Sequence, residues 1–169
     1  LPSDWLALNN DSLTISASGG TSAPVVELLT GHLDAVTDVA WSEGAFMLLT
    51  VSADSTAIVW DARRRVKVRQ AALQHQPCVV RFLPLNNNYF VVGMTTSATL
   101  RVFNLSTGML VKKVKVKHPV TAIEIPDPSA TATLSQCIFT GDAKGQLTAY
   151  TVNINAESSL LKVSATDLK

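Results

Sequence analysis

Three residue types that can form a nucleophilic triad occur near one another in the sequence: His32, Ser52 and Asp54. In such a triad the imidazole takes the serine proton and the carboxylate orients the imidazole. Many hydrolases of this kind also carry a strained nucleophile turn and an oxyanion loop rich in glycine. Neither motif accompanies these residues, and no other catalytic constellation is assembled. We therefore expect a non-enzymatic protein.

The two cysteines, Cys78 and Cys137, each lie in an apolar, strand-like run. Neither a CxxC spacing nor a histidine at metal-ligand spacing accompanies them, which indicates buried thiols. We expect no metal and no cofactor. So few cysteines are typical of a reducing compartment, and we expect the nucleus or the cytoplasm. The net charge of +1 predicts no strong attraction of the whole chain to nucleic acid or membrane.

The composition favours stacked sheets. Apolar residues make up 47% of the chain and charged residues 16%, so most segments must be buried on both faces. Short runs rich in Val, Ile, Leu, Thr and Phe recur between clusters of Gly, Asn, Asp, Ser and Pro, which indicates an all-β fold. The expected strands form three groups of four: 36–42, 46–52, 56–61, 66–73, then 78–83, 89–94, 99–104, 109–116, then 120–125, 136–141, 146–152 and 159–164.

The strand groups form an internal repeat. Trp60, Phe103 and Tyr150 each end a third strand, and the intervals between them suit one four-stranded blade of about 40–45 residues. The number of residues between His32 and Trp60 equals that between His75 and Phe103, which supports a true repeat. The repeat divides the chain into the end of a preceding blade (1–30) and three further blades (31–73, 74–117 and 118–169).

The first complete copy resembles a WD repeat. The resemblance is carried by Gly31-His32, Val36–Ser42, Ser52-Ala53-Asp54 and Ile58–Asp61. The WD-repeat family implies a β-propeller of four-stranded antiparallel WD40 blades, of which this chain would supply about three and part of a fourth. A propeller of seven blades needs roughly 300 residues, so we expect a partial propeller, a fragment of such a protein.

One member of the family gives a closer resemblance, over residues 25–152. It is carried by Pro84–Gly93, Asn104–Gly108 and Thr140–Gly145, and it implies a nuclear, non-enzymatic propeller protein. The sequence begins at Leu1 with neither a methionine nor the pattern of a signal peptide, so we expect an internal piece of a longer chain.

The family resemblance implies a buried hydrogen-bonded chain in the first blade, joining His32, Ser52, Asp54 and Trp60. The indole can only donate, the hydroxyl donates and accepts, the imidazole relays, and the carboxylate accepts. A buried chain in which every member is satisfied fixes the turn between the second and third strands. We expect this network to be structural.

The second blade departs from this pattern. It keeps His75 and has Thr95 at the place of the serine, but Ser97 replaces the aspartate. Phe103 replaces the tryptophan, which removes the indole donor. We therefore expect its network to be broken.

The third blade departs in another way. The nearest histidine is His118, Asp142 and Lys144 take the places of the serine and the aspartate, and Tyr150 replaces the tryptophan. Its turn is expected to depend on the sequence Asp-Ala-Lys-Gly and on the permissive Gly145. The blades should therefore differ in rigidity.

The resemblance also implies where a partner would bind. Propellers usually bind through the face lined by the turns between second and third strands and by the loops that enter each first strand. The residues expected there include no aromatic cluster or arginine pair of the kind that dominates interfaces. The alternative, that this rim is only solvated and the binding site lies on other blades, therefore remains. The residues expected on this rim are Asp34, Ala53, His75, Thr96, His118 and Ala143.

Basic residues cluster on two expected outer strands. Charged side chains on a strand edge discourage pairing with other sheets, which explains them simply. The alternative is a stripe that contacts nucleic-acid phosphates, although no stacking aromatics are interleaved for base readout. The residues are Arg63, Arg64, Arg65, Lys67, Arg69, Lys112, Lys113, Lys115 and Lys117.

These observations predict a non-enzymatic scaffold that binds other proteins. A nucleic-acid-associated module that uses the basic outer strands, Arg63–Arg69 and Lys112–Lys117, is the alternative. The missing blades would come from the rest of a longer chain or from another copy. No membrane contact is expected, because the longest apolar runs are only strand-sized.

Overall fold

The computed structural model describes residues 28–83, 86–126, 137–154 and 161–167, with side chains described through Thr151. The chain divides into two compact units, Leu1–Thr30 and Gly31–Lys169. All strands described below belong to the second unit. The part-blade predicted for residues 1–30 lies outside the described residues except for 28–30, which form neither helix nor strand.

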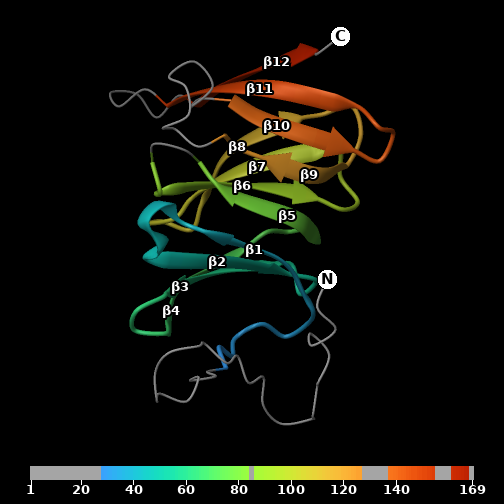
Figure 1. Ribbon diagram of the computed structural model, residues 1–169. Coiled ribbons are helices and arrows are strands. Elements are labelled where there is room, and N and C mark those ends of the chain that lie inside the picture. Colours follow the sequence, from blue (N-terminus) through green and yellow to red (C-terminus); the bar gives the residue numbers. More distant parts are fainter. Residues whose placement is uncertain (1–27, 84–85, 127–136, 155–160, 168–169) are drawn as a thin grey trace, which may run out of the picture. The chain divides into compact units, whose positions relative to one another are not determined.

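The second unit contains three four-stranded antiparallel sheets, in which neighbouring strands follow one another in sequence (Figure 1). The first blade comprises β1 (Val36–Trp41), β2 (Met47–Ser52), β3 (Thr56–Asp61) and β4 (Val66–Ala72). The second comprises β5 (Pro77–Phe82), β6 (Tyr89–Met94), β7 (Thr99–Asn104) and β8 (Leu110–Lys115). The third comprises β9 (Val120–Glu124), β10 (Cys137–Asp142), β11 (Leu147–Ile154) and β12 (Leu161–Asp167). The predicted all-β fold of four-stranded antiparallel sheets is confirmed, and the only helical element in the described ranges is the short 3-10 turn η2 (Glu43–Ala45).

The middle strands of the first two blades are mostly buried on both faces because the blades stack. In β3 the chain is buried from Ala57 to Trp60, and in β6 it is buried from Phe90 to Met94. β-Branched and aromatic residues dominate both strands, as suits a pleated surface that is covered on two sides. The outer strands β4 and β8 are mostly exposed, and their sequences carry the lysines and arginines.

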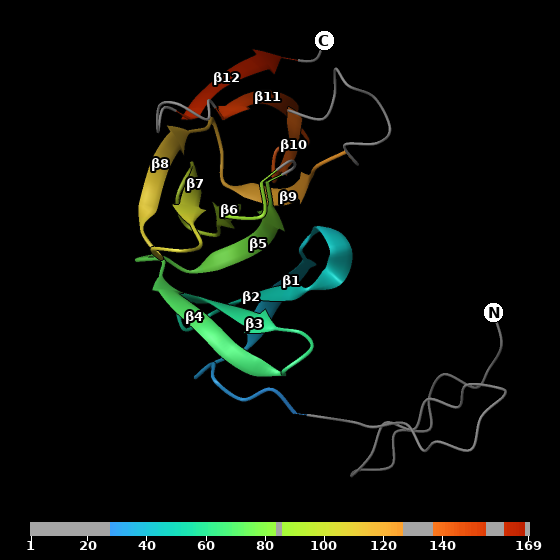
Figure 2. The same cartoon turned by 90° about the vertical axis from the view of Figure 1, so that its left-hand side faces the viewer.

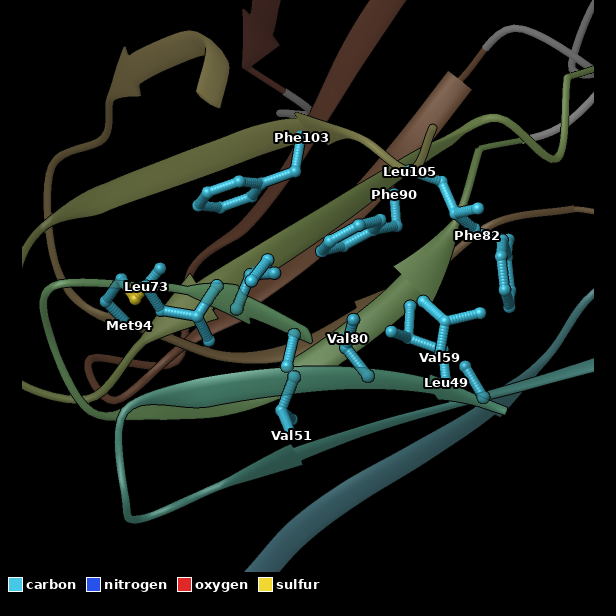
Figure 3. Packing of buried hydrophobic residues seen from close by; sticks show 14 residues of the cluster. Leu49, Val51, Val59, Leu73, Val80, Phe82, Phe90, Met94, Phe103 and Leu105 are labelled. Atoms are coloured by element: carbon cyan, nitrogen blue, oxygen red, sulfur yellow. The ribbon is translucent and has the colours of Figure 1, made fainter. Parts of the chain in front are cut away.

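The first and second blades pack face to face around one hydrophobic cluster (Figure 3). Leu49 and Val51 of β2 lie against Val80 of β5 and Phe90 of β6, and all four are almost fully buried. The rings of Phe90 and Phe103 stack with their centroids 5.4 Å apart. Burying a side chain of this size stabilises the fold by about 1.5–3 kcal/mol, so this interface is a main source of stability.

A second cluster joins the second and third blades. Val91 and Val102 contribute from the second blade, and Val120, Ile123 and Ile138 contribute from the third. The inner strands β1, β5 and β9 therefore lie side by side, each against the next (Figure 2). This is the arrangement of consecutive blades in a propeller.

Polar contacts tie the inner strands together across the blades. The Asp38 carboxylate of β1 accepts hydrogen bonds from the backbone N–H of Val80 and from Nη1 of Arg81, both at 2.9 Å. Nε of Arg81 lies 3.8 Å from the Glu124 carboxylate on β9. Glu124 is 77% exposed, so the Asp38–Arg81 pair is the stronger of the two ties.

The inner strand β1 of the first blade exposes large apolar side chains near its end. Trp41 and Phe82 are the last residues of β1 and β5, and they occupy equivalent places in their blades. The first blade covers Phe82, which is 8% exposed, whereas Trp41 is 57% exposed and Val39 is 50% exposed. This face has the apolar character of a blade interface.

Gly93 of β6 is required chiefly by the close approach of Val79 on the neighbouring strand β5. A Cβ atom there would lie 2.7 Å from Cγ1 of Val79 and 3.4 Å from Cγ1 of Val120. We expect Gly93→Ala to lower the free energy of unfolding by about 1–3 kcal/mol, because the added methyl group overpacks the space beside Val79. Urea unfolding followed by tryptophan fluorescence measures the change.

Gly141→Ala is the matched control, since the nearest atom to its Cβ would be Cβ of Ala122 at an ordinary 3.7 Å. Equal losses in the two variants would contradict the close approach at Gly93.

Candidate functional site

The turn between β2 and β3 is organised by the carboxylate of Asp54. Oδ1 of Asp54 accepts hydrogen bonds from the backbone N–H and the hydroxyl of Thr56, at 2.8 and 2.7 Å. Oδ2 accepts the backbone N–H of Leu33 at 2.9 Å. One side chain therefore holds the turn and also fastens it to the loop that precedes β1.

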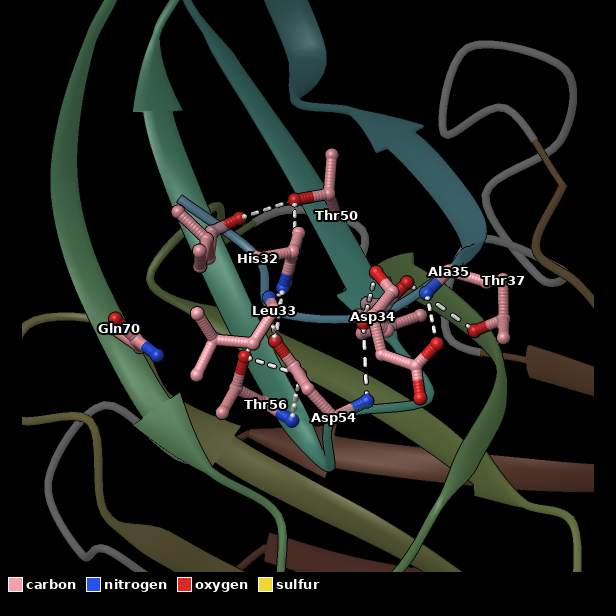
Figure 4. Close-up of polar contacts among 12 residues, drawn as sticks. His32, Leu33, Asp34, Ala35, Thr37, Thr50, Asp54, Thr56 and Gln70 are labelled. Atoms are coloured by element: carbon pink, nitrogen blue, oxygen red, sulfur yellow. Dashed lines mark hydrogen bonds and ion pairs between the residues drawn. The ribbon is translucent and has the colours of Figure 1, made fainter. Parts of the chain in front are cut away.

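His32 continues this network into the blade (Figure 4). Its Nδ1 lies 3.1 Å from Oδ2 of Asp54 and its Nε2 lies 2.8 Å from Oγ1 of Thr50. The indole Nε1 of Trp60 donates to the same Thr50 hydroxyl at 2.9 Å. The tautomer that carries its proton on Nδ1 satisfies the whole chain, with Trp60 donating to Thr50, Thr50 to His32, and His32 to Asp54.

The structure differs from the predicted chain at Ser52. Its hydroxyl donates to the backbone carbonyl of Asp34 at 3.0 Å and accepts the backbone N–H of Asp54 at 3.1 Å. Thr50 occupies the central place that was predicted for Ser52. Residues two apart on a strand share a face, so the alternation of β2 did not distinguish the two hydroxyls.

This geometry does not assemble a serine nucleophile. The Ser52 hydroxyl makes its contacts to the backbone, and no hydrogen bond between described residues joins it to His32. The imidazole instead bonds Thr50, whose oxygen also accepts the indole proton of Trp60. The chemistry available to this cluster is the fixing of a turn and a loop at one end of the blade.

The electrostatics of Asp54 follow from these contacts. Burial by itself would raise the pKa of Asp54, but the hydrogen bonds from Leu33, Thr56 and His32 outweigh it. Together they lower the pKa from 3.8 to about 2. The carboxylate is therefore ionised throughout the neutral range and accepts hydrogen bonds only.

The second blade replaces this network with a buried arginine. Arg101 of β7 is 2% exposed, and its Nη1 donates to the carbonyl of Leu73 at 2.7 Å and to Oε1 of Gln74 at 3.2 Å. His75 is exposed and outside this cluster. Sequence reasoning missed Arg101, although a single arginine inside a buried, otherwise apolar strand is a recognisable signal.

The pairing register corrects one predicted position in the second blade. Met94 ends β6 as Ser52 ends β2, so Met94, not Thr95, takes the place of the serine. Val92 takes the place of Thr50, as the registers of the two strand pairs show. Valine has no hydroxyl, so it cannot link a histidine to an aromatic donor as Thr50 does in the first blade. Ser97 lies in the turn, where its hydroxyl bonds that of Thr99 at 3.0 Å.

The third blade keeps a histidine–aspartate pair in a new form. Nδ1 of His118 lies 2.9 Å from Oδ2 of Asp142. Oδ1 of Asp142 accepts the backbone N–H groups of Lys144 and Gln146, and these contacts, that of Gln146 first, lower the pKa of Asp142. Gly145 has a φ of 75°, which is the left-handed region that favours glycine in the predicted turn.

The positions predicted for partner binding all lie in loops at one end of the sheets. They fall in the turns β2–β3, β6–β7 and β10–β11 and in the segments that enter β1, β5 and β9. Four are exposed and two, Ala53 and His118, are half-buried. The exposed ones are Asp34, His75, Thr96 and Ala143.

The basic residues lie on or beside the outer strands β4 and β8, and all are exposed. Several make local contacts. The guanidinium of Arg63 lies 4.9 Å above the ring of Phe46, and Nζ of Lys67 donates to Gln70. This placement on the free edges of the blades agrees with protection against edge pairing.

Comparison with known proteins identifies a family to which the first repeat is similar. Residues 23–61 match the family model described as "WD domain, G-beta repeat". Residues 23–61 are therefore similar to one WD repeat. The matched residues include the loop before β1 and the strands β1, β2 and β3, and so they contain the network around Asp54.

The relatives that the chain resembles are much longer proteins. The chain is 32% identical over 85 residues to a subunit of chromatin assembly factor 1 from Gallus gallus, and 29% identical over 82 residues to the same subunit from Mus musculus. These matches cover 49% and 47% of the chain but 14% of each relative. A chain in the crystal structure of a mitotic checkpoint complex is similar in fold, with a TM-score of 0.62 at 21% identity, over 82% of this chain and 40% of that one.

The described residues also bear on two other classes of site. No helix among them is long and apolar enough to cross a membrane. Within the same part of the chain, no three His, Cys, Asp or Glu side chains are grouped so that they could hold a metal ion.

The indole N–H of Trp60 in the first blade is the donor that the network depends on. We expect Trp60→Phe to lower the free energy of unfolding by about 1–3 kcal/mol, because Thr50 loses its buried donor and a cavity forms. Thermal or urea unfolding measures the loss. Trp41→Phe is the matched control at a half-exposed tryptophan, and an equal effect of both changes would contradict the network.

The depressed pKa of Asp54 predicts a pH dependence of stability. The pKa is about 2 in the folded chain and about 3.9 in an unfolded one, so the ionised carboxylate stabilises the fold above about pH 4. This stabilisation is lost as the pH falls from about 4 towards 2. We expect the stability difference between wild type and Asp54→Asn to be largest near neutral pH and to shrink over that range.

Urea unfolding at a series of pH values measures this difference. Asp34→Asn, at an exposed aspartate beside the same loop, is the control. A difference between wild type and Asp54→Asn that stays constant from neutral pH to pH 2 would contradict the assignment.

Proposed function

We propose that this chain is part of a non-enzymatic WD-repeat propeller that binds other proteins. The observation that carries the proposal is the rim of the WD repeat. There Asp54 fastens the β2–β3 turn to the loop entering β1 through Leu33. A rim fixed in this way displays its side chains with little loss of conformational freedom on binding.

The binding face is the end of the blades where these loops meet. In the first blade, the Ser52 hydroxyl holds the carbonyl of Asp34, so the exposed Asp34 carboxylate projects from a fixed backbone. In the second, the backbone N–H of Thr95 donates to the carbonyl of Gln76 and joins the β6–β7 turn to the loop entering β5. The residues proposed to contact a partner are Asp34, Ala53, His75, Thr96, His118 and Ala143.

The relatives support a nuclear setting for the proposed scaffold. Two of them are named as subunits of a chromatin assembly factor. The order of segments along residues 25–152 also resembles the middle of WD repeat-containing protein 13. We propose that the remaining blades are supplied by the rest of a longer chain or by another copy. The exposed apolar side chains of Val39 and Trp41 have the character of a surface against which another blade would pack.

Affinity capture with the 169-residue chain as bait tests the proposal. Nuclear extract is treated with nuclease, and bound proteins are quantified by mass spectrometry. The rim variant is Asp34→Arg with Thr96→Arg, and its matched control on an outer strand is Lys112→Glu with Lys113→Glu. We expect the rim variant to lose specific partners by about tenfold or more, since mismatched charge at an interface costs several kcal/mol, and the control to retain them.

Two outcomes contradict the proposal. One is recovery that is unchanged in the rim variant. The other is recovery that disappears with nuclease and in the outer-strand control, which would show that the basic strands bind nucleic acid.

A further inference from the structure

The second blade holds a buried guanidinium that has only neutral hydrogen-bond acceptors among the described residues. Arg101 of β7 is 2% exposed, and both of its hydrogen bonds run from Nη1, to the carbonyl of Leu73 and to Oε1 of Gln74. Its Nε is buried and has no hydrogen-bond partner in the described part of the chain. An arginine stays protonated in a protein, and burying its charge is costly unless that charge is paired. Arg101 therefore retains a positive charge that an anion can balance.

Two lysines on the neighbouring strand add to this positive charge. Lys113 of β8 lies directly opposite Arg101, and Lys115 lies on the same face of β8. Both lysines are exposed, and no ion pair between described residues involves either lysine or Arg101. Like charges on directly opposite residues of a sheet destabilise it. An anion beside Arg101 would offset this repulsion.

Gln74 places a neutral amide against the guanidinium. Gln74 is exposed, whereas Arg101 is buried, and the two side chains meet at 3.2 Å. The φ angle of Gln74 is 65°, which lies in the left-handed region that favours glycine, and the first blade has Gly31 at this place. Residues held in such a conformation are found preferentially at functional sites. Gln74 is therefore a candidate for a functional position as well as a structural one.

The contact between Gln74 and Arg101 can be exchanged for a stronger one. An exposed side chain changes its rotamer rapidly, so the amide of Gln74 can leave Arg101 without a change in the fold. A carboxylate forms shorter and stronger hydrogen bonds with a guanidinium than a neutral amide does, and it can accept two N–H groups at once. A carboxylate that arrives from the solvent therefore displaces the Gln74 amide from Arg101.

We propose that Arg101 binds the carboxylate of an Asp or Glu side chain on a protein partner, and that Gln74 takes this place when the partner is absent. The proposal rests on the proposed function, because Gln74 directly precedes His75 in the loop that enters β5 on the partner-binding rim. Lys113 adds positive charge that attracts an acidic segment to this end of the blade. The kind of partner that fits the second blade is thus an acidic protein segment.

NMR of the arginine Nε–H groups in the 169-residue chain tests the proposal. The probe is N-acetylglutamate α-amide, whose only charge is the side-chain carboxylate, and the reference is N-acetylglutamine α-amide, which lacks that charge. Both are titrated at constant ionic strength. We expect a saturable shift of the Arg101 Nε–H signal with the glutamate probe and none with the glutamine reference. No saturable shift with the glutamate probe, or equal shifts with both compounds, would overturn the proposal.

Gln74→Glu supplies the carboxylate from within the chain. We expect this variant to bind the glutamate probe about tenfold more weakly or worse, because its own carboxylate occupies Arg101. Gln70→Glu is the matched control, since Gln70 is an exposed glutamine whose side chain contacts Lys67. We expect the control to bind the probe as wild type does. Equal weakening in the two variants, or undiminished binding by Gln74→Glu, would overturn the proposal.

Arg101→Ile as bait in the affinity capture separates this proposal from the proposed function. Ile58 holds the equivalent place in the first blade, so an isoleucine suits the sheet, and circular dichroism checks that the variant is folded. We expect Arg101→Ile to lose the specific partners by about tenfold or more, as the rim variant does. Partners lost by the rim variant but kept by Arg101→Ile would overturn the carboxylate site and leave the scaffold proposal standing. Partners kept by the rim variant would contradict the scaffold proposal, and the NMR titration would still decide whether Arg101 binds a carboxylate.

Discussion

The buried indole N–H of Trp60 must find an acceptor inside the first blade, and the rest of the rim depends on how it does so. Thr50 accepts it and can then donate to His32, which donates to Asp54. A single buried donor thereby sets the orientation of three further side chains from three segments of the chain. Because Asp54 also holds the Leu33 backbone, the network ends at the surface, where loops are displayed.

The same constraint explains why the second blade differs from the first at several linked positions. Once Phe103 replaces the indole, no donor requires a hydroxyl at the place of Thr50, and Val92 stands there. Arg101 enters this space and donates hydrogen bonds to two neutral acceptors, the Leu73 carbonyl and the Gln74 side chain. A guanidinium tolerates such surroundings because it is weakly hydrated and spreads its charge over several N–H groups. The second blade therefore has a different network in place of the one it lost.

Much of the architecture could be predicted because it depends on local patterns. The strand alternation and the turn residues indicated the four-stranded sheets, and the interval from His32 to Trp60 indicated the repeat. What escaped prediction depends on exact register. Thr50 and Ser52 lie on the same face of β2, so strand alternation alone does not show which hydroxyl bonds His32. Whether Met94 or Thr95 is equivalent to Ser52 depends on the length of the turn after β6. Arg101 was overlooked because its acceptors, on the chain before β5, are brought to it only by folding.

Charged residues on the inner strands of the blades make contacts between blades, whereas those on the outer strands are exposed. On the inner strands, Asp38 and Arg81 face each other at 2.9 Å, and Asp38 also takes the Val80 N–H, so the charges are used between blades. On the outer strands the charges are exposed, and exposed charges on a strand edge keep it from pairing with other sheets. We therefore expect the inner strands to be the most rigid part of the blades. The rim loops are held by them because these loops lead directly into β1 and β5. A binding surface on these rim loops loses less conformational entropy when a partner binds, because the loops are already held by the inner strands. The affinity for the partner is then higher.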